Sequence, residues 1–139
     1  MYLLDTNVVS ELRKAQAGKS DPGVRAWAES IDAASMFLSV ISLLELELGV
    51  LLMERRDPMR GSLLRSWLEK QVRPVFSGRI LAIDEPVAQR CAALHVPNPC
   101  SYRDSLIAAT AIVHGLTVVT RNITDFESAE IALLNPWQN

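Results

Sequence analysis

The chain opens with an apolar run that stops abruptly at three polar residues, YLLDTN at positions 2–7. A short apolar run of this kind is typical of a buried strand in a parallel sheet. Such a strand would deliver Asp5 directly to its carboxyl end, which is where ligand sites form in open α/β sheets. These first residues therefore predict both a parallel sheet and a polar site at its edge.

The rest of the chain alternates helical and strand-like segments. We expect further strands at 36–41, 79–83, 116–120 and 131–134. We expect helices at 8–14, from Pro22, from Ser42, over 63–72 ending before Pro74, from Asp84, and at 102–114. The segment 95–101, which contains Pro97 and Pro99, should be a loop. This alternation predicts an α/β protein with a three-layer α/β/α arrangement, in which helices flank a short, mainly parallel central sheet.

Length and composition are those of one domain. The chain has 139 residues, 49% of them hydrophobic, which is enough to bury one substantial core. We see no repeat or linker and expect a single domain over 1–139. Asp5 and Glu11 interrupt the region where a signal peptide would be apolar, and no run reaches the roughly 18–20 apolar residues of a membrane span. We therefore expect a cytoplasmic protein without membrane contact.

The net charge does not decide whether the chain binds nucleic acid, and its two cysteines indicate no metal or disulfide framework. The formal charge of −2 gives no global case for nucleic-acid binding, because nucleic-acid modules are typically basic. However, if four of the 16 acidic residues held a metal, the remaining balance would be positive. Cys91 and Cys100 form no paired CxxC set, so the sequence supports neither a zinc site nor a disulfide framework.

Two of the candidate site acids stand in helices and have an ordinary explanation. Ser42-x-x-Glu45 and Ser101-x-x-Asp104 both match a capping box, in which the acid bonds back to the amide of the cap residue. Capping does not explain why the helical neighbours of Glu45 and Asp104 are mostly apolar. An unpaired ionised carboxylate in such surroundings would be costly.

Two more acids follow predicted strands. Asp5 comes directly after the first strand, and Asp125 lies in the loop after the strand at 116–120, where it could simply cap a turn before Phe126. Carboxylates gathered at the mouth of one core repel one another, and a hard divalent cation is the usual compensation. Asp5, Glu45, Asp104 and Asp125 are therefore our candidate metal-binding and catalytic residues.

The ligand set indicates the metal and the chemistry. Oxygen-only coordination, with His95 and His114 as poor ligand candidates, favours Mg²⁺ or Mn²⁺ over zinc. Such a cluster suits phosphodiester hydrolysis, in which the metal activates water and neutralises charge in the transition state. The sequence contains no GxxxxGK[ST] loop, no GxGxxG after the first strand and no GxSxG elbow.

Four segments resemble, in order, the motifs of PIN-domain toxins of the VapC group. They are LLDTNVVS at 3–10, SLLELELG at 42–49, DSLIAATA at 104–111 and TRNITDF at 120–126. GRIL at 78–81, DEPVA at 84–88 and NPW at 135–137 are similar to the FitB-like branch of that family. The resemblance covers essentially the whole chain, and four motifs in the right order are far more specific than one.

The resemblance implies the PIN-domain fold and an endoribonuclease that depends on Mg²⁺ or Mn²⁺. It further implies the toxin of a type II toxin–antitoxin system, with RNA as substrate and a small cognate antitoxin as inhibitor, whose C-terminal segment reaches the active site. It also implies a homodimer, and operator DNA bound only indirectly, through the antitoxin. The apolar surface of the helical hairpin at 42–73 exceeds what a small sheet can cover, so part of it is the expected dimer interface.

Matching by position implies the roles of the site residues. Asp5, Glu45 and Asp104 match the metal-binding acids of the family. At the fourth position some members have aspartate where this chain has Asn122, and others have asparagine there with an acid three residues later. We assign the metal-side role to Asp125 and a hydrogen-bonding or water-positioning role to Asn122.

Supporting contacts to the acid and to the substrate are expected nearby. Thr6 and Asn7 are expected to hold the Asp5 carboxylate in place. The cations available to substrate phosphates are Arg13, Lys14, Arg103 and Arg121.

Two other interpretations remain open on the sequence. One is a non-catalytic PIN-like module that binds an antitoxin partner and regulates DNA binding, which Asn122 would favour. The other is a phosphoacceptor receiver domain, which would need paired acids after the first strand, where Asn7 stands.

Overall fold

Five short parallel strands form the central sheet of the protein. The computed structural model describes residues 1–138. The strands are β1 Tyr2–Leu4, β2 Met36–Ser39, β3 Ile80–Leu81, β4 Thr117–Val119 and β5 Leu133–Leu134. Their spatial order is β3-β2-β1-β4-β5 and each neighbouring pair is parallel, so the first strand of the chain is the central one. The expected parallel sheet is confirmed.

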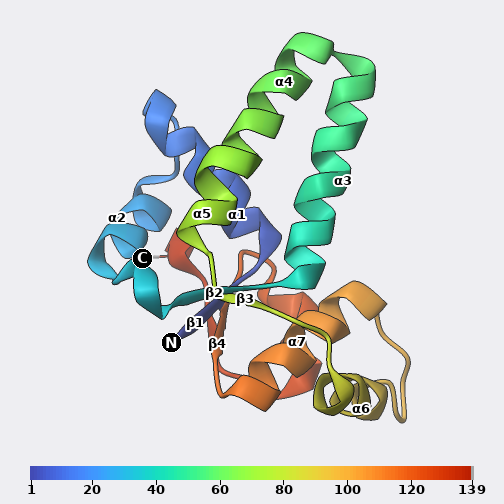
Figure 1. Cartoon of the computed structure of the whole chain (residues 1–139). Coiled ribbons are helices and arrows are strands. Elements are labelled where there is room, and N and C mark those ends of the chain that lie inside the picture. The colour runs from blue at the N-terminus through green and yellow to red at the C-terminus, as the bar shows by residue number, and fades with distance from the viewer. Residues whose placement is uncertain (139) are drawn as a thin grey trace.

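Helices cover both faces of this sheet, which confirms the expected α/β/α layering (Figure 1). The α-helices are α1 Thr6–Arg13, α2 Pro22–Ser30, α3 Val40–Arg56, α4 Pro58–Trp67, α5 Arg73–Val75, α6 Glu85–Leu94 and α7 Tyr102–His114. A π-helical turn, Leu68–Val72, joins α4 to α5. Short 3₁₀ turns lie at Lys14–Ala17, Ala33–Ser35, Ile123–Asp125, Glu127–Ala129 and Pro136–Gln138.

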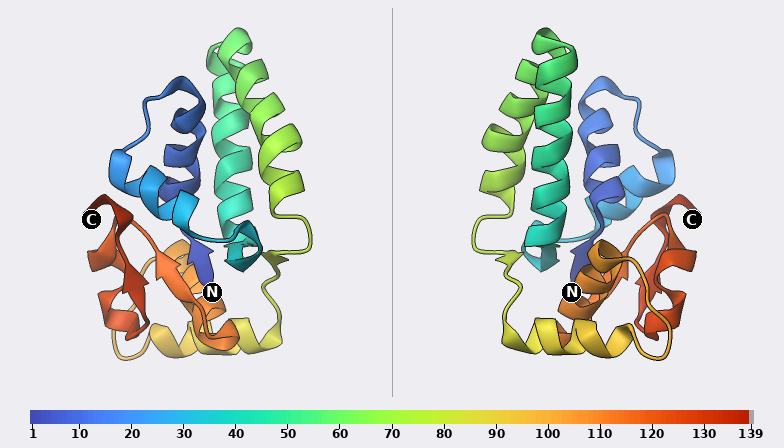
Figure 2. Two further views of the ribbon diagram at one scale, coloured as in Figure 1. Left: turned by 90° about the vertical axis from the view of Figure 1, so that its left-hand side faces the viewer. Right: turned by 90° about the vertical axis from the view of Figure 1, so that its right-hand side faces the viewer.

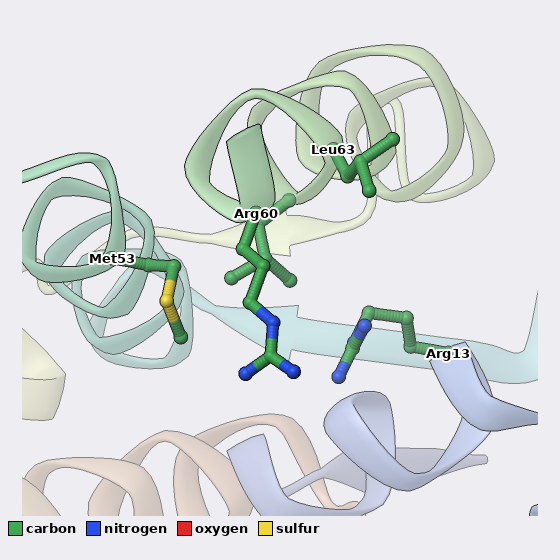
Figure 3. Close-up of a pocket in the computed structure, with 5 residues that line it drawn as sticks. Arg13, Met53, Arg60 and Leu63 are labelled. Atoms are coloured by element: carbon green, nitrogen blue, oxygen red, sulfur yellow. The ribbon is translucent and has the colours of Figure 1, made fainter. Parts of the chain in front are cut away.

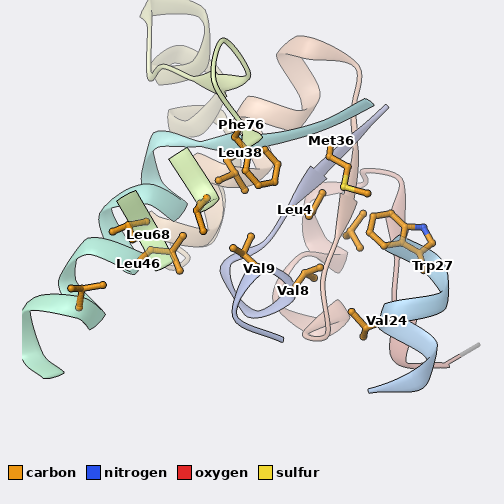
Figure 4. Packing of buried hydrophobic residues seen from close by; sticks show 13 residues of the cluster. Leu4, Val8, Val9, Val24, Trp27, Met36, Leu38, Leu46, Leu68 and Phe76 are labelled. Carbon is orange, nitrogen blue, oxygen red and sulfur yellow. The ribbon is translucent and has the colours of Figure 1, made fainter. Parts of the chain in front are cut away.

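Adjacent leucines of β1 serve two different cores, because successive side chains of a strand point to opposite faces. Leu4 packs in a cluster with side chains from α1, α2, α3 and β2, among them Val8, Trp27 and Leu38 (Figure 4). Leu3 packs on the other face against Ile107 and its neighbours in α7. Both leucines are completely buried, so the polar residue that follows them is fixed at the centre of the sheet edge.

Helices α3 and α4 form a hairpin that projects beyond the sheet, with the two helices side by side (Figure 2). They approach most closely at Gly61, where a Cβ atom would lie 2.4 Å from the Cα of Glu54. Arg65 of α4 fastens the hairpin, because its guanidinium reaches Glu47 at 2.8 Å and Glu54 at 3.1 Å. The hairpin exposes several large apolar side chains: Leu44, Leu48, Leu51, Leu52, Met59 and Leu63.

Several expected boundaries were wrong: α1 begins at Thr6, the helix expected from 63 begins at Pro58, and the strands expected at 79–83 and 131–134 are only two residues long. The strand expected over 36–41 ends at Ser39, whose hydroxyl accepts from the N–H of Ile41, so α3 begins at Val40, two residues earlier than expected. The helix expected to end before Pro74 continues through it. The preceding π-helical turn, in which the N–H of Arg73 bonds to the carbonyl of Leu68, widens the backbone where the proline ring would otherwise clash.

Other sequence expectations agree with the structure. Asp84 caps α6 by accepting from the N–H of Val87 at 3.2 Å, and Gly115 ends α7 in the left-handed conformation. Cys91 and Cys100 are free thiols. Among the helices of residues 1–138, none has the length and apolar character that a membrane crossing requires.

Candidate active site

Asp5 stands at the junction between the central strand and α1. Its N–H continues the ladder to the carbonyl of Val119 at 2.9 Å, and its side chain is the N-cap of α1. One carboxylate oxygen accepts from the N–H of Thr6 at 2.8 Å, and the other accepts from the hydroxyl of Thr120 at 2.7 Å and from the amide of Asn7 at 3.4 Å. Asp5 is only 7% exposed, and these three donors fix its orientation.

Glu45 reaches the same place from α3. Its Oε1 accepts from the hydroxyl of Thr6 at 2.7 Å, and its Oε2 lies 3.6 Å from a guanidinium nitrogen of Arg103. Thr6 therefore holds Asp5 through its backbone and Glu45 through its side chain. The capping-box interpretation of Glu45 is wrong, because α3 begins at Val40 and Ser42 lies buried inside the helix.

Asp104 lies in the first turn of α7 and faces the same cleft. Ser101 occupies the N-cap position of that helix, but its side chain makes no capping hydrogen bond. The capping box expected there is therefore incomplete. Asp104 lines the cleft, and a hydrogen bond with the side chain of Ser101 lowers its pKa against the larger, opposite effect of burial.

Asn122 and Asp125 contribute to the site in different ways. Asn122 lines the cleft and its N–H donates to the hydroxyl of Thr120 at 3.0 Å, so the turn that carries it is tied to Asp5. Asp125 is close enough to raise the pKa of both Asp5 and Asp104 by charge repulsion. Three of the four acids that the sequence singled out, Asp5, Glu45 and Asp104, line one cleft, whereas Asp125 is not part of its lining.

Burial and mutual repulsion act on these acids in the same direction. Burial raises the pKa of Asp5, and the nearby Glu45 and Asp125 raise it further, against the hydrogen bonds from Thr120 and Thr6 that lower it. Burial also raises the pKa of Asp104, and repulsion from Asp125, Asp5 and Glu45 adds to the effect. The ionised cluster is therefore electrostatically unfavourable by itself. A bound cation would relieve it.

The acids open into a polar cleft of about 450 Å³. Its lining residues are Asp5, Thr6, Asn7, Ser10, Glu11, Lys14, Glu45, Asp104, Arg121, Asn122 and Trp137. Within residues 1–138 no three acidic, histidine or cysteine side chains stand close enough to hold one ion directly. Mg²⁺ is commonly bound by only one or two carboxylates and keeps several waters. The oxygen donors of Asp5, Glu45 and Asp104 fit such an ion by their chemistry.

Sequence reasoning did not assign a role to Thr120 or Trp137. Thr120 is 115 positions from Asp5, and only its place at the carboxyl end of a predicted strand hinted at the contact. Trp137 reaches the cleft from the far end of the chain. Of the four expected cations, Lys14 and Arg121 line the cleft and Arg103 contacts Glu45.

The fourth expected cation, Arg13, lines a different cavity. This cavity, of about 390 Å³, lies between α1 and the hairpin and is lined by Arg13, Met53, Arg60, Leu63 and Leu64. Figure 3 shows the guanidinium groups of Arg13 and Arg60 pointing toward one another across it. None of the four candidate acids belongs to its lining.

A serine and a histidine also meet between α6 and α7 but do not form a nucleophilic pair. The Nε2 atom of His95 lies 2.9 Å from the hydroxyl of Ser105, and its Nδ1 atom accepts from the N–H of Cys100 at 3.4 Å. Ser105 donates to the carbonyl of Tyr102 at 3.1 Å. Because the Ser105 side chain is buried and its hydroxyl already bonds to a backbone carbonyl, it is not presented to a substrate.

The sheet order, the acids at its carboxyl edge and the projecting hairpin define one class of protein. The chain belongs to the PIN domain family, whose sequence profile matches residues 2–131. It is similar over its whole length to the toxin FitB of Neisseria gonorrhoeae, with 40% identity covering 100% of both proteins. It is also 36% identical to the VapC ribonuclease Y4jK of Sinorhizobium fredii, over 99% of each.

Solved structures agree with these relatives. The chain is similar to the crystal structure of FitAcB from Neisseria gonorrhoeae with a TM-score of 0.90 and 38% identity, covering 100% of both chains. It is similar to the structure of FitAB bound to an IR36 DNA fragment with a TM-score of 0.88 and 37% identity, covering 99% of this chain and 96% of that one. The resemblance to the VapC group and its FitB-like branch is thereby confirmed.

Proposed function

We propose that this chain is the toxin of a type II toxin–antitoxin system and acts as an endoribonuclease that depends on Mg²⁺ or Mn²⁺. The observation that carries the proposal is the cleft at the carboxyl edge of the sheet, which Asp5, Glu45 and Asp104 line together and in which Asp5 and Asp104 have raised pKa values. Relatives named as a toxin and as a ribonuclease support the same function.

Each residue of the site has a part in this chemistry. Asp5 and Asp104 are the principal metal ligands, and Glu45 and Asp125 complete the cluster or orient water. Thr120, Thr6 and Asn7 hold the Asp5 carboxylate through the contacts described above. The metal, when bound, supplies an activated water and neutralises charge on the phosphate in the transition state.

The cations around the cleft fit a phosphodiester substrate. Lys14 and Arg121 line the cleft, and Arg103 lies against Glu45, so all three are placed to contact phosphate oxygens of an RNA strand. Asn122 takes the hydrogen-bonding or water-positioning role, because its backbone is fixed to Thr120.

The partners follow from the relatives. We propose a small antitoxin as the cognate inhibitor and operator DNA as a ligand of the complex through that antitoxin, since the chain is similar to the structure of FitAB bound to a DNA fragment. We further propose a cytoplasmic homodimer that uses part of the hairpin's exposed apolar surface, which includes Leu48, Leu52 and Leu63.

A non-catalytic module that only binds an antitoxin and regulates DNA binding is the second candidate. Asn122 at the fourth acidic position favours it, as does the lack of three directly converging ligands among residues 1–138. The two candidates differ in whether purified protein cuts RNA.

Cleavage of a mixed RNA pool tests the proposal. Purified chain is incubated with Mg²⁺, with Mn²⁺ or with EDTA, beside the variants Asp5→Asn and Asp104→Asn, whose folding is checked by circular dichroism. We expect cleavage only with metal and only in the parent chain. Undiminished cleavage by either folded variant would remove the mechanism, and absence of cleavage under all conditions would favour the binding module.

A further inference from the structure

One wall of the acidic cleft is formed by an arginine and a tryptophan in contact. Arg121 and Trp137 both line the cleft, and the guanidinium carbon of Arg121 lies 5.4 Å from the centre of the Trp137 ring. The metal chemistry proposed above uses the acids and the charge of Arg121. It gives no role to the stack that the guanidinium and the indole ring form together.

A chain of hydrogen bonds fixes this pair relative to Asp5. The N–H of Arg121 donates to the side chain of Asn7, and its carbonyl accepts from the amide of Asn135, both at 3.4 Å. The N–H of Trp137 in turn donates to the side-chain oxygen of Asn135 at 2.9 Å. Asn7 and Thr120, which precedes Arg121, both donate hydrogen bonds to Asp5. The Arg121–Trp137 pair, called the platform below, is therefore connected to Asp5 by one network of hydrogen bonds.

Packing fixes the pair from the other side. The turn Pro136–Gln138 lies against the start of α2 so closely that a Cβ atom on Gly23 would be 2.5 Å from the carbonyl of Pro136. The Trp137 ring is half-buried against the core cluster around Leu4. The platform is therefore held in place before any ligand arrives, which lowers the entropy cost of binding.

We propose that Arg121 and Trp137 form a stacking site for one unpaired RNA base next to the phosphate held at the acids. Aromatic rings and guanidinium planes both stack on bases that are not already stacked in a duplex. The cleft is otherwise lined mainly by polar and charged residues, which suits the sugar and phosphate beside such a base better than the apolar side chains of a peptide. The inference rests on the proposed ribonuclease function and adds to it a subsite for one base of the substrate.

A second arginine–tryptophan pair in the chain provides a matched control. The guanidinium carbon of Arg13 lies 6.0 Å from the centre of the Trp67 ring, and Trp67 is also half-buried. That pair lies outside the acidic cleft. Stacking with a base at the reactive phosphate should therefore depend on Trp137 and not on Trp67.

The test compares Trp137→Leu, Trp137→Phe and Trp67→Leu in the full-length chain. Affinity for a short single-stranded oligoribonucleotide and for its duplex is measured by fluorescence anisotropy in EDTA, so that no cleavage occurs. KM and kcat are then measured with Mg²⁺. We expect Trp137→Leu to weaken single-strand binding about 5- to 100-fold and to raise KM, because leucine fills space without a stacking face. Trp137→Phe should retain most of the affinity, and Trp67→Leu should retain all of it.

Each other outcome has a definite meaning. If the Trp137→Leu protein unfolds at the parent temperature and also binds single-stranded RNA with the parent affinity, the inference is overturned. Trp137 would then be a packing residue only. Equal losses for single strand and duplex would also overturn it, since they would indicate phosphate contacts alone. If antitoxin binding falls while RNA affinity is unchanged, the platform belongs to a peptide and the inference is wrong.

The two proposals fail separately. Metal-dependent cleavage with no effect of Trp137→Leu on KM or binding would refute the stacking site and leave the nuclease intact. Single-strand binding that depends on Trp137 in a chain that cuts no RNA would refute the nuclease and support the stacking site.

Discussion

Two clusters of acidic residues in this protein have opposite electrostatic surroundings. On the hairpin, Glu47, Glu54 and Glu69 all contact Arg65, whose hydrogen bonds lower the pKa of Glu47. At the edge of the sheet, burial and neighbouring acids raise the pKa of Asp5 and Asp104 instead. The hairpin acids are each paired with an arginine of the chain, whereas the sheet-edge acids are buried and repel one another.

This difference separates a structural use of charge from a functional one. Exposed ion pairs contribute little to stability individually, but several on one arginine help to hold two helices in register. Unfavourable charge at a site persists because function requires it and the rest of the fold supplies the stability. Neutralising one acid in each cluster should therefore have opposite consequences, and the following predictions test this contrast.

The largest expected effect is on catalysis. Asp104→Asn should lower RNA cleavage by about three orders of magnitude, because a lost metal ligand removes several kcal/mol of transition-state stabilisation. Glu47→Gln, which removes the same charge from the hairpin, should cleave at the parent rate. Both rates are measured at saturating Mg²⁺, and equal losses in the two variants would abolish the distinction between the clusters.

The next effect concerns the contact that brings the hairpin helices together. Gly61→Ala should destabilise the fold by about 1–3 kcal/mol, because the new Cβ atom meets the backbone of Glu54, which cannot move aside cheaply. Gly49→Ala, in α3, meets nothing within 4 Å and should stabilise the chain by about 0.5–1 kcal/mol. Urea unfolding measures the free energy of unfolding of both variants. A Gly61→Ala protein as stable as the parent would contradict the close approach of α3 and α4 at this residue.

A substitution on the exposed apolar surface of the hairpin should have a smaller effect, which is a loss of dimer affinity. Leu52 is 61% exposed in the single chain, and Leu52→Glu should weaken dimerisation at least about tenfold, because a two-fold interface would bury the charge twice. Val96→Glu changes a side chain that is 76% exposed on the loop between α6 and α7 and serves as the control. Analytical ultracentrifugation over a range of protein concentrations measures the dimer dissociation constant of each variant. A parent chain that is monomeric at all concentrations would contradict the predicted homodimer.

The smallest effect is on the pH dependence of stability without metal. Because the pKa of Asp104 is raised above its ordinary value of 3.8, its proton stabilises the native state fully below that value, and this contribution is lost as pH rises through the raised pKa. The pKa of Glu47 is lowered from 4.5, so its contribution is present above that value and lost as pH falls through the lowered pKa.

Thermal unfolding in EDTA should show these opposite signs. At neutral pH, Asp104→Asn should raise Tm and Glu47→Gln should lower it, by no more than a few degrees in each case. Both differences should shrink in strong acid, where each parent carboxyl is protonated. Shifts of the same sign at neutral pH would show that the two clusters do not differ as described.

The fold and the four acids could be predicted because their signals are local. An apolar run ending in Asp5 and the order of the four motifs required no knowledge of distant contacts. The start of α3 could not be placed, because Ser39 and Ser42 are equally good cap residues and only the pairing of β2 decides between them. Likewise, the passage of a helix through Pro74 depends on a π-helical turn that has no sequence signal of its own.

The contacts that complete the site were missed because they join distant parts of the chain. Thr120 reaches Asp5 only because β4 pairs with β1, and Trp137 reaches the cleft only because β5 follows β4. A parallel sheet order cannot be read from the sequence of its strands alone.

The position of β1 at the centre of the sheet also determines when the site can exist. Asp5 precedes by more than a hundred positions the strand and hydroxyl that hold it, at 117–120, and the tryptophan at the rim of the cleft follows still later. Because synthesis proceeds from the N-terminus at about 5–20 residues per second, these parts of the cleft are added several seconds after Asp5. Under the ribonuclease function proposed above, a growing chain that has not reached residue 117 would lack the complete site.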